Sequence, residues 1–254
     1  MAGHNKWSKI KHRKAVVDKR RGKAWTMCAR AIIVAAKQGG GDANFNISLR
    51  TAMDDARYYN MPNDNIERAI KKGLGGGEGD DYVPVRYEGY GPGGAALIVD
   101  ALTNNRTRTA GDIRLIFTKH ESKMGVSGAV AHQFDQRGRI VVSSKTINGD
   151  AIFEAAVEAG ADDVRSVDTD SDELPSWEVL TAPERYTEVL AKLKAAKLSI
   201  GETGIDMLPN LSVTVAGQFA KDLLEMIDAL EDNDDVKKVY TNADIPDADL
   251  AALE

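Results

Sequence analysis

The hydrophobic pattern of this chain changes period at a glycine-rich stretch, Gly73 to Asp81, in which five of nine residues are glycine. Before this stretch, apolar residues recur at three- and four-residue spacing, which is typical of amphipathic helices. After it, short apolar runs are separated by turn residues, which is typical of strands. We therefore predict that the stretch is a flexible linker between a helical unit and a unit that contains sheets.

Three helices are predicted before the linker. The first spans Asp18 to Lys37, where Trp25, Cys28 and Ile32 fall on one face, and three glycines then stop it. The second follows an apolar stripe from Leu49 to Ala56, and the third begins with Asn63 as its cap. Because the connections are short, the three helices are expected to pack as one small domain.

The remainder of the chain alternates strands and helices. A hairpin is predicted from Tyr82–Glu88 and Ala95–Ala101, followed by a helix from Arg106 to His120. The next elements have the order βαββαβ, which is typical of a ferredoxin-like unit. Their expected ranges are strand 139–143, helix 150–159, strand 163–169, strand 176–180, helix 183–197 and strand 205–208. A strand at 211–215, a periodic helix at 219–231 and a strand at 236–240 follow.

The last three elements cannot close a domain alone, so we expect them to complete the earlier hairpin and helix. The predicted fold class is α+β with three domains. They are a basic N-terminal helical bundle at 1–75, a discontinuous α+β domain at 82–128 plus 210–245, and a ferredoxin-like domain inserted at 129–209.

Positive charge is concentrated at the N-terminus. The first 37 residues contain eleven Lys and Arg against one acid, Asp18, a balance of +10, whereas the whole chain carries −6. Such segregation favours oriented binding of a polyanion, and Trp7 and Trp25 add aromatic surface for base stacking. The simpler interpretation is a solvated basic arm. The candidate nucleic-acid contacts here are Lys6, Trp7, Lys9, Lys11, Arg13, Lys14, Lys19, Arg20, Arg21 and Lys23.

A second polar segment, Thr103 to Thr109, combines hydroxyls, amides and two guanidiniums at a predicted strand-to-helix junction. Arg106 and Arg108 are candidate nucleic-acid contacts there, because a helix N-terminus adds N–H groups to an anion site. Helix capping with solvent-exposed arginines explains the same residues equally well.

Several classes of protein are disfavoured by the sequence. The apolar runs are strand-sized, which is too short to span a membrane. The single cysteine, Cys28, fits a reducing cytosol, so we expect a cytoplasmic protein. The four histidines lack zinc-site spacing, and Gly89-x-Gly91-x-x-Gly94 precedes a strand rather than a helix. We expect no metal, no cofactor and no catalysis. An enzyme that uses Arg86 and the Asn104–Thr109 segment to handle phosphate is the competing class.

Many spaced motifs agree with one known family. They are Met1-Ala2-Gly3-His4, Lys6-Trp7, Gly22-Lys23, Asn60-Met61-Pro62, Tyr87-Glu88-Gly89-Tyr90-Gly91-Pro92 and Leu102-Thr103 with Asn105-Arg106. With them the chain resembles the YebC/PmpR family, to which mitochondrial translational activators of cytochrome c oxidase also belong. The resemblance runs from residue 1 to about 245. It implies the three-domain arrangement and a regulator without catalytic activity.

The resemblance leaves the nucleic acid open. Bacterial members are classed as DNA-binding transcriptional regulators, and other relatives are implicated in translation at the ribosome. The expected partner is therefore DNA, or alternatively structured RNA such as the ribosome. The acidic domains would face protein partners, and a pure protein adaptor is a third possibility. The sequence does not define the oligomeric state.

Overall fold

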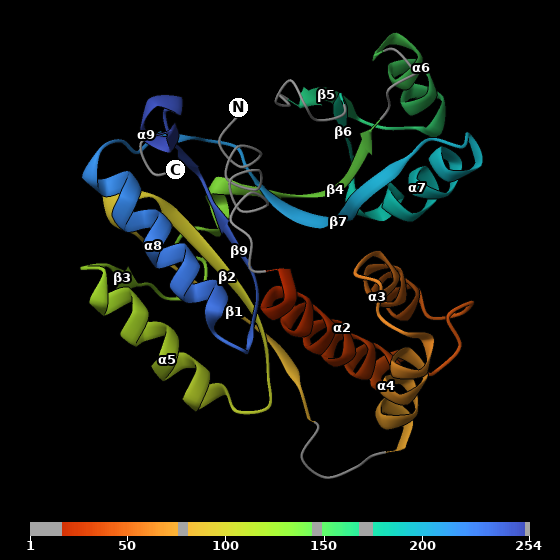
Figure 1. Ribbon diagram of the computed structural model, residues 1–254, viewed down its shortest axis with the longest axis horizontal. Helices are drawn as coiled ribbons and strands as arrows, with labels where there is room; N and C mark the ends of the chain where they lie inside the picture. Colours follow the sequence, from red (N-terminus) through yellow and green to blue (C-terminus); the bar gives the residue numbers. More distant parts are fainter. Residues whose placement is uncertain (1–16, 76–80, 144–148, 168–174, 252–254) are drawn as a thin grey trace.

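The computed structural model describes residues 17–75, 81–143, 149–167 and 175–251 (Figure 1). These residues form a helical unit and two larger sheets, each of the two sheets with helices against it. The predicted α+β class is confirmed.

The helical unit contains α2 (Val17–Gly39), α3 (Ile47–Tyr58) and α4 (Asn63–Gly75). These match the three helices predicted before the linker. Ile32 of α2 and Leu49 of α3 are fully buried in their shared core, and Ile66 of α4 is nearly so. Asn46 caps α3 by accepting a hydrogen bond from the N–H of Leu49 at 3.0 Å.

The predicted start of the linker is wrong, because α4 continues as far as Gly75. Gly73 is buried at the point where α4 crosses α2, and a Cβ added there would lie 2.6 Å from the carbonyl oxygen of Ile33. This glycine permits close helix packing rather than flexibility. Residues 76–80 of the predicted linker lie outside the described residues.

The first sheet has the strand order β3-β1-β2-β9. The strands are β1 (Val83–Tyr90), β2 (Ala96–Thr103), β3 (Lys123–Met124) and β9 (Val236–Thr241). The predicted hairpin is confirmed: β1 pairs antiparallel with β2 around the short 3-10 helix η1 (Pro92–Gly94). Strand β9 pairs with the other edge of β2, so the C-terminal segment completes this sheet as expected.

Helices α5 (Arg106–Lys119) and α8 (Gln218–Asp232) cover one face of the first sheet (Figure 1). Phe117 and Leu223 pack there against Leu97 and Val99 of β2. The neighbouring Ala96 and Ile98 face the opposite side, where they meet Phe134 and Met207 of the second sheet. Strand β2 is therefore buried on both faces, which explains its continuous apolar sequence.

The second sheet has the order β5-β6-β4-β7, with every neighbouring pair antiparallel. Its strands are β4 (Phe134–Ser143), β5 (Asp163–Val167), β6 (Ser176–Thr181) and β7 (Ile200–Pro209). Helices α6 (Gly149–Ala159) and α7 (Tyr186–Ala195) cover it, with Ile152 and Leu193 fully buried against the strands. This order is that of a split βαβ unit.

Several predicted ranges in the second half differ from the structure. Strand β4 starts at Phe134, five residues before the predicted residue 139. Strand β7 starts five residues earlier than predicted, because its polar first half pairs with β4 without an apolar signal. The helix predicted from Pro183 begins as the 3-10 turn η3 (Pro183–Arg185). The strand predicted at 211–215 shrinks to β8 (Val213–Thr214), which pairs with β10 (Ala243–Asp244) in a separate two-stranded sheet. The short helix α9 (Asp247–Ala251) follows.

Candidate nucleic-acid interface

The predicted basic segment lies partly outside the described residues. Lys6, Trp7, Lys9, Lys11, Arg13 and Lys14 precede residue 17. Lys19, Arg20 and Arg21 belong to the first turns of α2, so their backbone is helical. The interface predicted for these nine residues stays a prediction.

Lys23, in contrast, is engaged within the chain. Its ammonium group donates hydrogen bonds to the carbonyl oxygens of Glu231 and Asn233, the latter at 2.6 Å. These carbonyls end α8, which has no basic residue in its own last turn. A cation at a helix C-terminus is favoured by the helix dipole. Lys23 therefore docks α2 onto the end of α8.

Further along α2, Arg30 makes the second docking contact. Its Nη1 donates to the carboxylate of Asp235 at 2.8 Å and to the carbonyl oxygens of Leu102 and Asp234 at 3.1 and 2.8 Å. The guanidinium also lies 4.8 Å from the centre of the Tyr82 ring, a cation–π distance. Helix α2 is thus fixed to the end of α8 by Lys23 and to the first sheet by Arg30.

The polar segment at 103–109 converges on the same carboxylate. Asp235 accepts hydrogen bonds from Thr109 at 2.6 Å, Arg108 at 2.7 Å and Thr103 at 3.2 Å. Asn105 caps α5 by accepting from the N–H of Arg108 at 3.0 Å. Asn105 thus caps the helix as one interpretation expected, and the nucleic-acid contacts predicted at Arg106 and Arg108 stay a prediction. Sequence reasoning missed Asp235, which lies 126 residues from Thr109 and belongs to no motif.

The ionisation of Asp235 follows from these donors. Burial by itself raises the pKa of a carboxyl, but the hydrogen bonds from Thr109, Arg108 and Arg30 outweigh burial and lower the pKa of Asp235.

Arg106 lies apart from this cluster. Its side chain is exposed and makes no hydrogen bond or ion pair with any residue that the structure describes.

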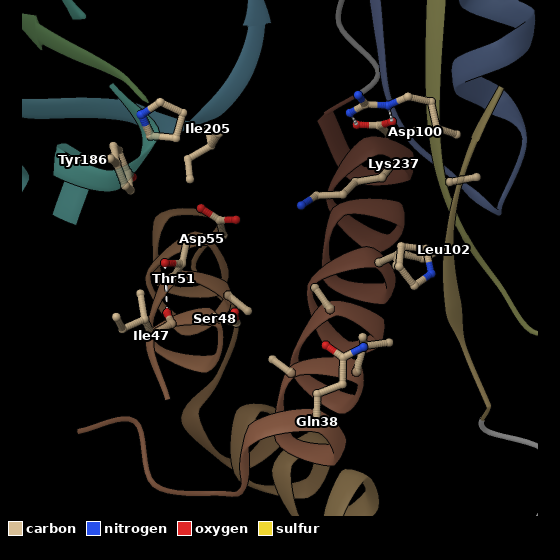
Figure 2. A pocket seen from close by; sticks show the side chains of 18 of the residues that line it. Gln38, Ile47, Ser48, Thr51, Asp55, Asp100, Leu102, Tyr186, Ile205 and Lys237 are labelled. Atoms are coloured by element: carbon tan, nitrogen blue, oxygen red, sulfur yellow. Dashed lines mark hydrogen bonds and ion pairs between the residues drawn. The ribbon is translucent and has the colours of Figure 1, made fainter. Parts of the chain in front are cut away.

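A cavity of 680 Å³ lies where the helical unit meets both sheets (Figure 2). Its walls come from α2, α3, β1, β2, β7, β9 and the η3–α7 segment, and most of them are apolar. The proposed phosphate-handling groups do not converge there. Arg86 lines the cavity but is paired with Asp100 through two bonds of 2.7 and 2.9 Å, and the Asn104–Thr109 segment contributes no lining residue.

Asp55 of α3 and Lys237 of β9 point toward each other across this cavity (Figure 2). Within the described ranges, neither side chain makes a hydrogen bond or ion pair. Burial raises the pKa of Asp55 to about 6, and the positive charge of Lys237 offsets part of that effect. The carboxyl group is therefore held in a position that disfavours its charged form.

Metal-binding and membrane-spanning features are absent from the described part of the chain. No cluster of three or more His, Cys, Asp or Glu side chains there is arranged to hold a metal ion. No described helix is long and apolar enough to cross a membrane.

The fold and the sequence motifs define one class of protein. The model for the TACO1/YebC N-terminal domain matches residues 5–76, and the model for the TACO1/YebC second and third domain matches residues 82–243. The chain therefore belongs to the TACO1/YebC family, as its motifs indicated.

Full-length relatives agree with this assignment. The chain is 49% identical over 253 residues to a probable transcriptional regulatory protein of Citrifermentans bemidjiense, covering 100% of both chains. It is 47% identical to another of the same description from Geobacter sulfurreducens, again over 100% of both. Its structure is similar to the crystal structure of a conserved hypothetical protein from Aquifex aeolicus. That match has a TM-score of 0.83 and 40% identity, and covers 94% of this chain and 96% of the other.

Proposed function

We propose that this protein is a non-enzymatic, cytoplasmic regulator of gene expression that binds nucleic acid through the basic residues that precede Gly22. One observation carries the proposal. Of the eleven cations in residues 1–37, the three whose side chains are described, Lys23, Arg30 and Lys37, bond to groups of this chain. The other eight precede Gly22, and only Asp18 opposes them in the sequence.

The docking contacts of α2 orient this basic segment relative to the acidic remainder of the chain. Lys23 fixes α2 to the end of α8 and Arg30 fixes it to the first sheet, so α2 begins at a defined place on an otherwise acidic chain. The body repels a polyanion while the segment attracts it, which orients the complex. The relatives are described as probable transcriptional regulatory proteins, which supports transcription as the setting and therefore DNA as the polyanion. The acidic surfaces are then available to protein partners.

A second candidate is a translation factor that binds structured RNA. It is favoured because the sequence has one basic helix and no leucine zipper to pair two recognition helices, the device by which many operator-reading proteins reach specificity. Irregular RNA, in contrast, offers unpaired bases and 2′-hydroxyls to a single basic element.

Competition binding at fixed salt tests the proposal and separates the two candidates. Labelled duplex DNA bound to the full chain is challenged with promoter DNA, scrambled duplex and ribosomes. A promoter that competes about 100-fold better than scrambled duplex supports transcription, because specific sites exceed random DNA by roughly 10³ or more. Strong competition by ribosomes alone supports translation. Absence of binding to any of them would contradict the proposed function.

A further inference from the structure

A second hollow lies on the helical unit, on the side of α2 and α4. It has a volume of 380 Å³ and is bounded by Gly22 and Trp25 of α2, by Met61 before α4, and by Asn65, Arg68 and Lys72 of α4. We refer to it as the α2–α4 groove. It starts at Gly22, immediately after the turn of α2 that carries Lys19, Arg20 and Arg21 in the sequence.

Trp25 forms a fixed wall of this groove. The residue is half-buried and packs against the core of the helical unit on its inner side. Its indole Nε1 donates a hydrogen bond to the carbonyl oxygen of Tyr59 at 2.8 Å, which holds the ring in one orientation. A rigid aromatic side chain that borders an open groove is suited to stacking with a planar ligand.

The rim of the groove is cationic. Arg68 and Lys72, both exposed, are its charged lining residues, and no described Asp or Glu lines it. The Arg68 guanidinium bonds to the Asp64 carbonyl oxygen at 3.2 Å and to the side-chain oxygen of Asn65, both within its own helix. Because a guanidinium has five N–H donors, Arg68 retains donors for a phosphate or a base edge.

We propose that the α2–α4 groove binds one unpaired base of the nucleic acid, stacked on Trp25, with the adjoining phosphate near Arg68 and Lys72. This rests on the proposed function, since the basic segment next to the groove supplies the attraction for the strand. A base inside a duplex is not free to enter such a groove. The preferred ligand is therefore a single-stranded or looped segment, from DNA or from RNA.

Intrinsic fluorescence tests the stacking directly. The chain has three tryptophans, so a Trp7→Phe/Trp177→Phe double variant leaves Trp25 as the only one. This variant is titrated at fixed salt with 12-nucleotide oligo-dT, 12-nucleotide oligo-U, a duplex, and an abasic strand of equal charge. We expect both oligonucleotides to quench Trp25, and the duplex and the abasic strand to bind without quenching. The ratio of the dT and U affinities distinguishes DNA from RNA as the source of the base.

A groove-filling substitution supplies the second test. A Cβ added at Gly22 has none of the described heavy atoms within 4 Å, and Gly22 has no positive φ, so the backbone there accepts the Cβ of Gly22→Leu at the edge of the groove. Leucine also favours helix more than glycine does, so we expect the variant to fold. We expect an affinity loss of about tenfold for single strands and none for the abasic strand, consistent with the loss of one stacked base.

Gly111→Leu is the matched control, because Gly111 is also an exposed helical glycine with open space around it, on α5. It should change neither affinity nor quenching. Unchanged binding and quenching in Gly22→Leu, or equal quenching by the abasic strand, would overturn the groove proposal alone. If none of the strands bound the chain, the proposed function would fail along with it.

Discussion

Arg30 of α2 donates to the carboxylate of Asp235 at 2.8 Å although 205 residues separate them in the sequence. The same carboxylate accepts from Thr103, Arg108 and Thr109, so one buried acid joins the helical unit, β2 and α5. The position of the basic helix relative to the acidic body depends on this contact.

Replacing Asp235 should therefore destabilise the chain and release α2. In Asp235→Asn the Arg30 guanidinium, whose side chain is only 14% exposed, loses its counter-charge, which typically costs about 3 kcal/mol when the pair is buried. We expect a correspondingly lower free energy of unfolding in urea and faster proteolysis of the helical unit. Glu188→Gln, which removes an exposed ion pair with Lys192 of 2.7 Å, is the control and should leave stability unchanged. Equal stability of the two variants would contradict the docking role of Asp235.

The hydrogen bonds that Glu88 accepts lead us to expect that the chain loses stability in acid. The nearly buried carboxylate accepts hydrogen bonds of 2.9 Å from the N–H groups of Gly128, Val130 and Ala131. Burial raises the pKa of Glu88, but these three bonds outweigh burial and lower it below its ordinary value of 4.5. The stabilisation is present above pH 4.5 and is lost as the pH falls through the lowered pKa.

Glu88→Gln checks this directly. At pH 7 it should lower stability by about 1–3 kcal/mol, because the amide offers one acceptor oxygen to three donors. Urea unfolding at pH 7 and at pH 3 measures the effect. The difference between wild type and variant should shrink at pH 3. A constant difference across this range would show that the charge of Glu88 is not the cause.

For Asp55 we expect the opposite dependence of folding stability on pH. Burial raises the pKa of Asp55 from 3.8 to about 6, so the folded state binds this proton more tightly than the unfolded state. Its contribution to stability therefore falls as the pH rises from about 4 to 6. Asp55→Asn should stabilise the chain at pH 7 by about 1–3 kcal/mol. Thermal unfolding at pH 7 measures this effect. Asp54→Asn is the control, because Asp54 is paired with Arg57 and Lys194 and its replacement should not raise stability.

Alanine substitutions at Gly73 and Gly75, two glycines in the last turn of α4, test whether Gly73 belongs to the packed helix or to a linker. A Cβ added at Gly73 lies 2.6 and 2.8 Å from atoms of Ile33 and Ala36, whereas one added at Gly75 has none of the described heavy atoms within 4 Å. Gly73→Ala should destabilise the helical unit by about 1–3 kcal/mol through overpacking. Gly75→Ala should be neutral or stabilising by up to about 1 kcal/mol. Calorimetry of both variants checks this, and equal melting temperatures would restore the linker interpretation of Gly73.

The sequence was most informative where periodicity alone decides an element. The stripe through Cys28 and Ile32 predicted α2, and the glycine turn at 89–94 predicted the hairpin of β1 and β2. It was misleading at Gly73, since glycine in a sequence does not distinguish a flexible joint from a close helix crossing. It also missed β7 before Ile205, where backbone pairing proceeds without an apolar pattern.

The candidate site was predicted only in part, because charge counts do not show which cations bind internally. Lys23 and Arg108 carry the expected charge but contact the α8–β9 region, a relationship that depends on tertiary folding. Asp235 and the α2–α4 groove each bring together residues that are distant in the sequence, and no single motif contains them. Periodicity along a single helix cannot reveal them.

Salt dependence of nucleic-acid binding tests the central claim most directly. The variants are Lys9→Glu/Lys11→Glu/Lys14→Glu, which reverses part of the basic segment, and Lys23→Gln, which changes a docking cation. If roughly five cations contact duplex phosphates, log K should fall against log salt with a slope of about −4 to −5. We predict a much weaker affinity and a shallower slope for the triple variant, and a wild-type slope with reduced folding stability for Lys23→Gln. A flat salt response of the wild-type chain, or a triple variant that binds as tightly as wild type, would contradict the account.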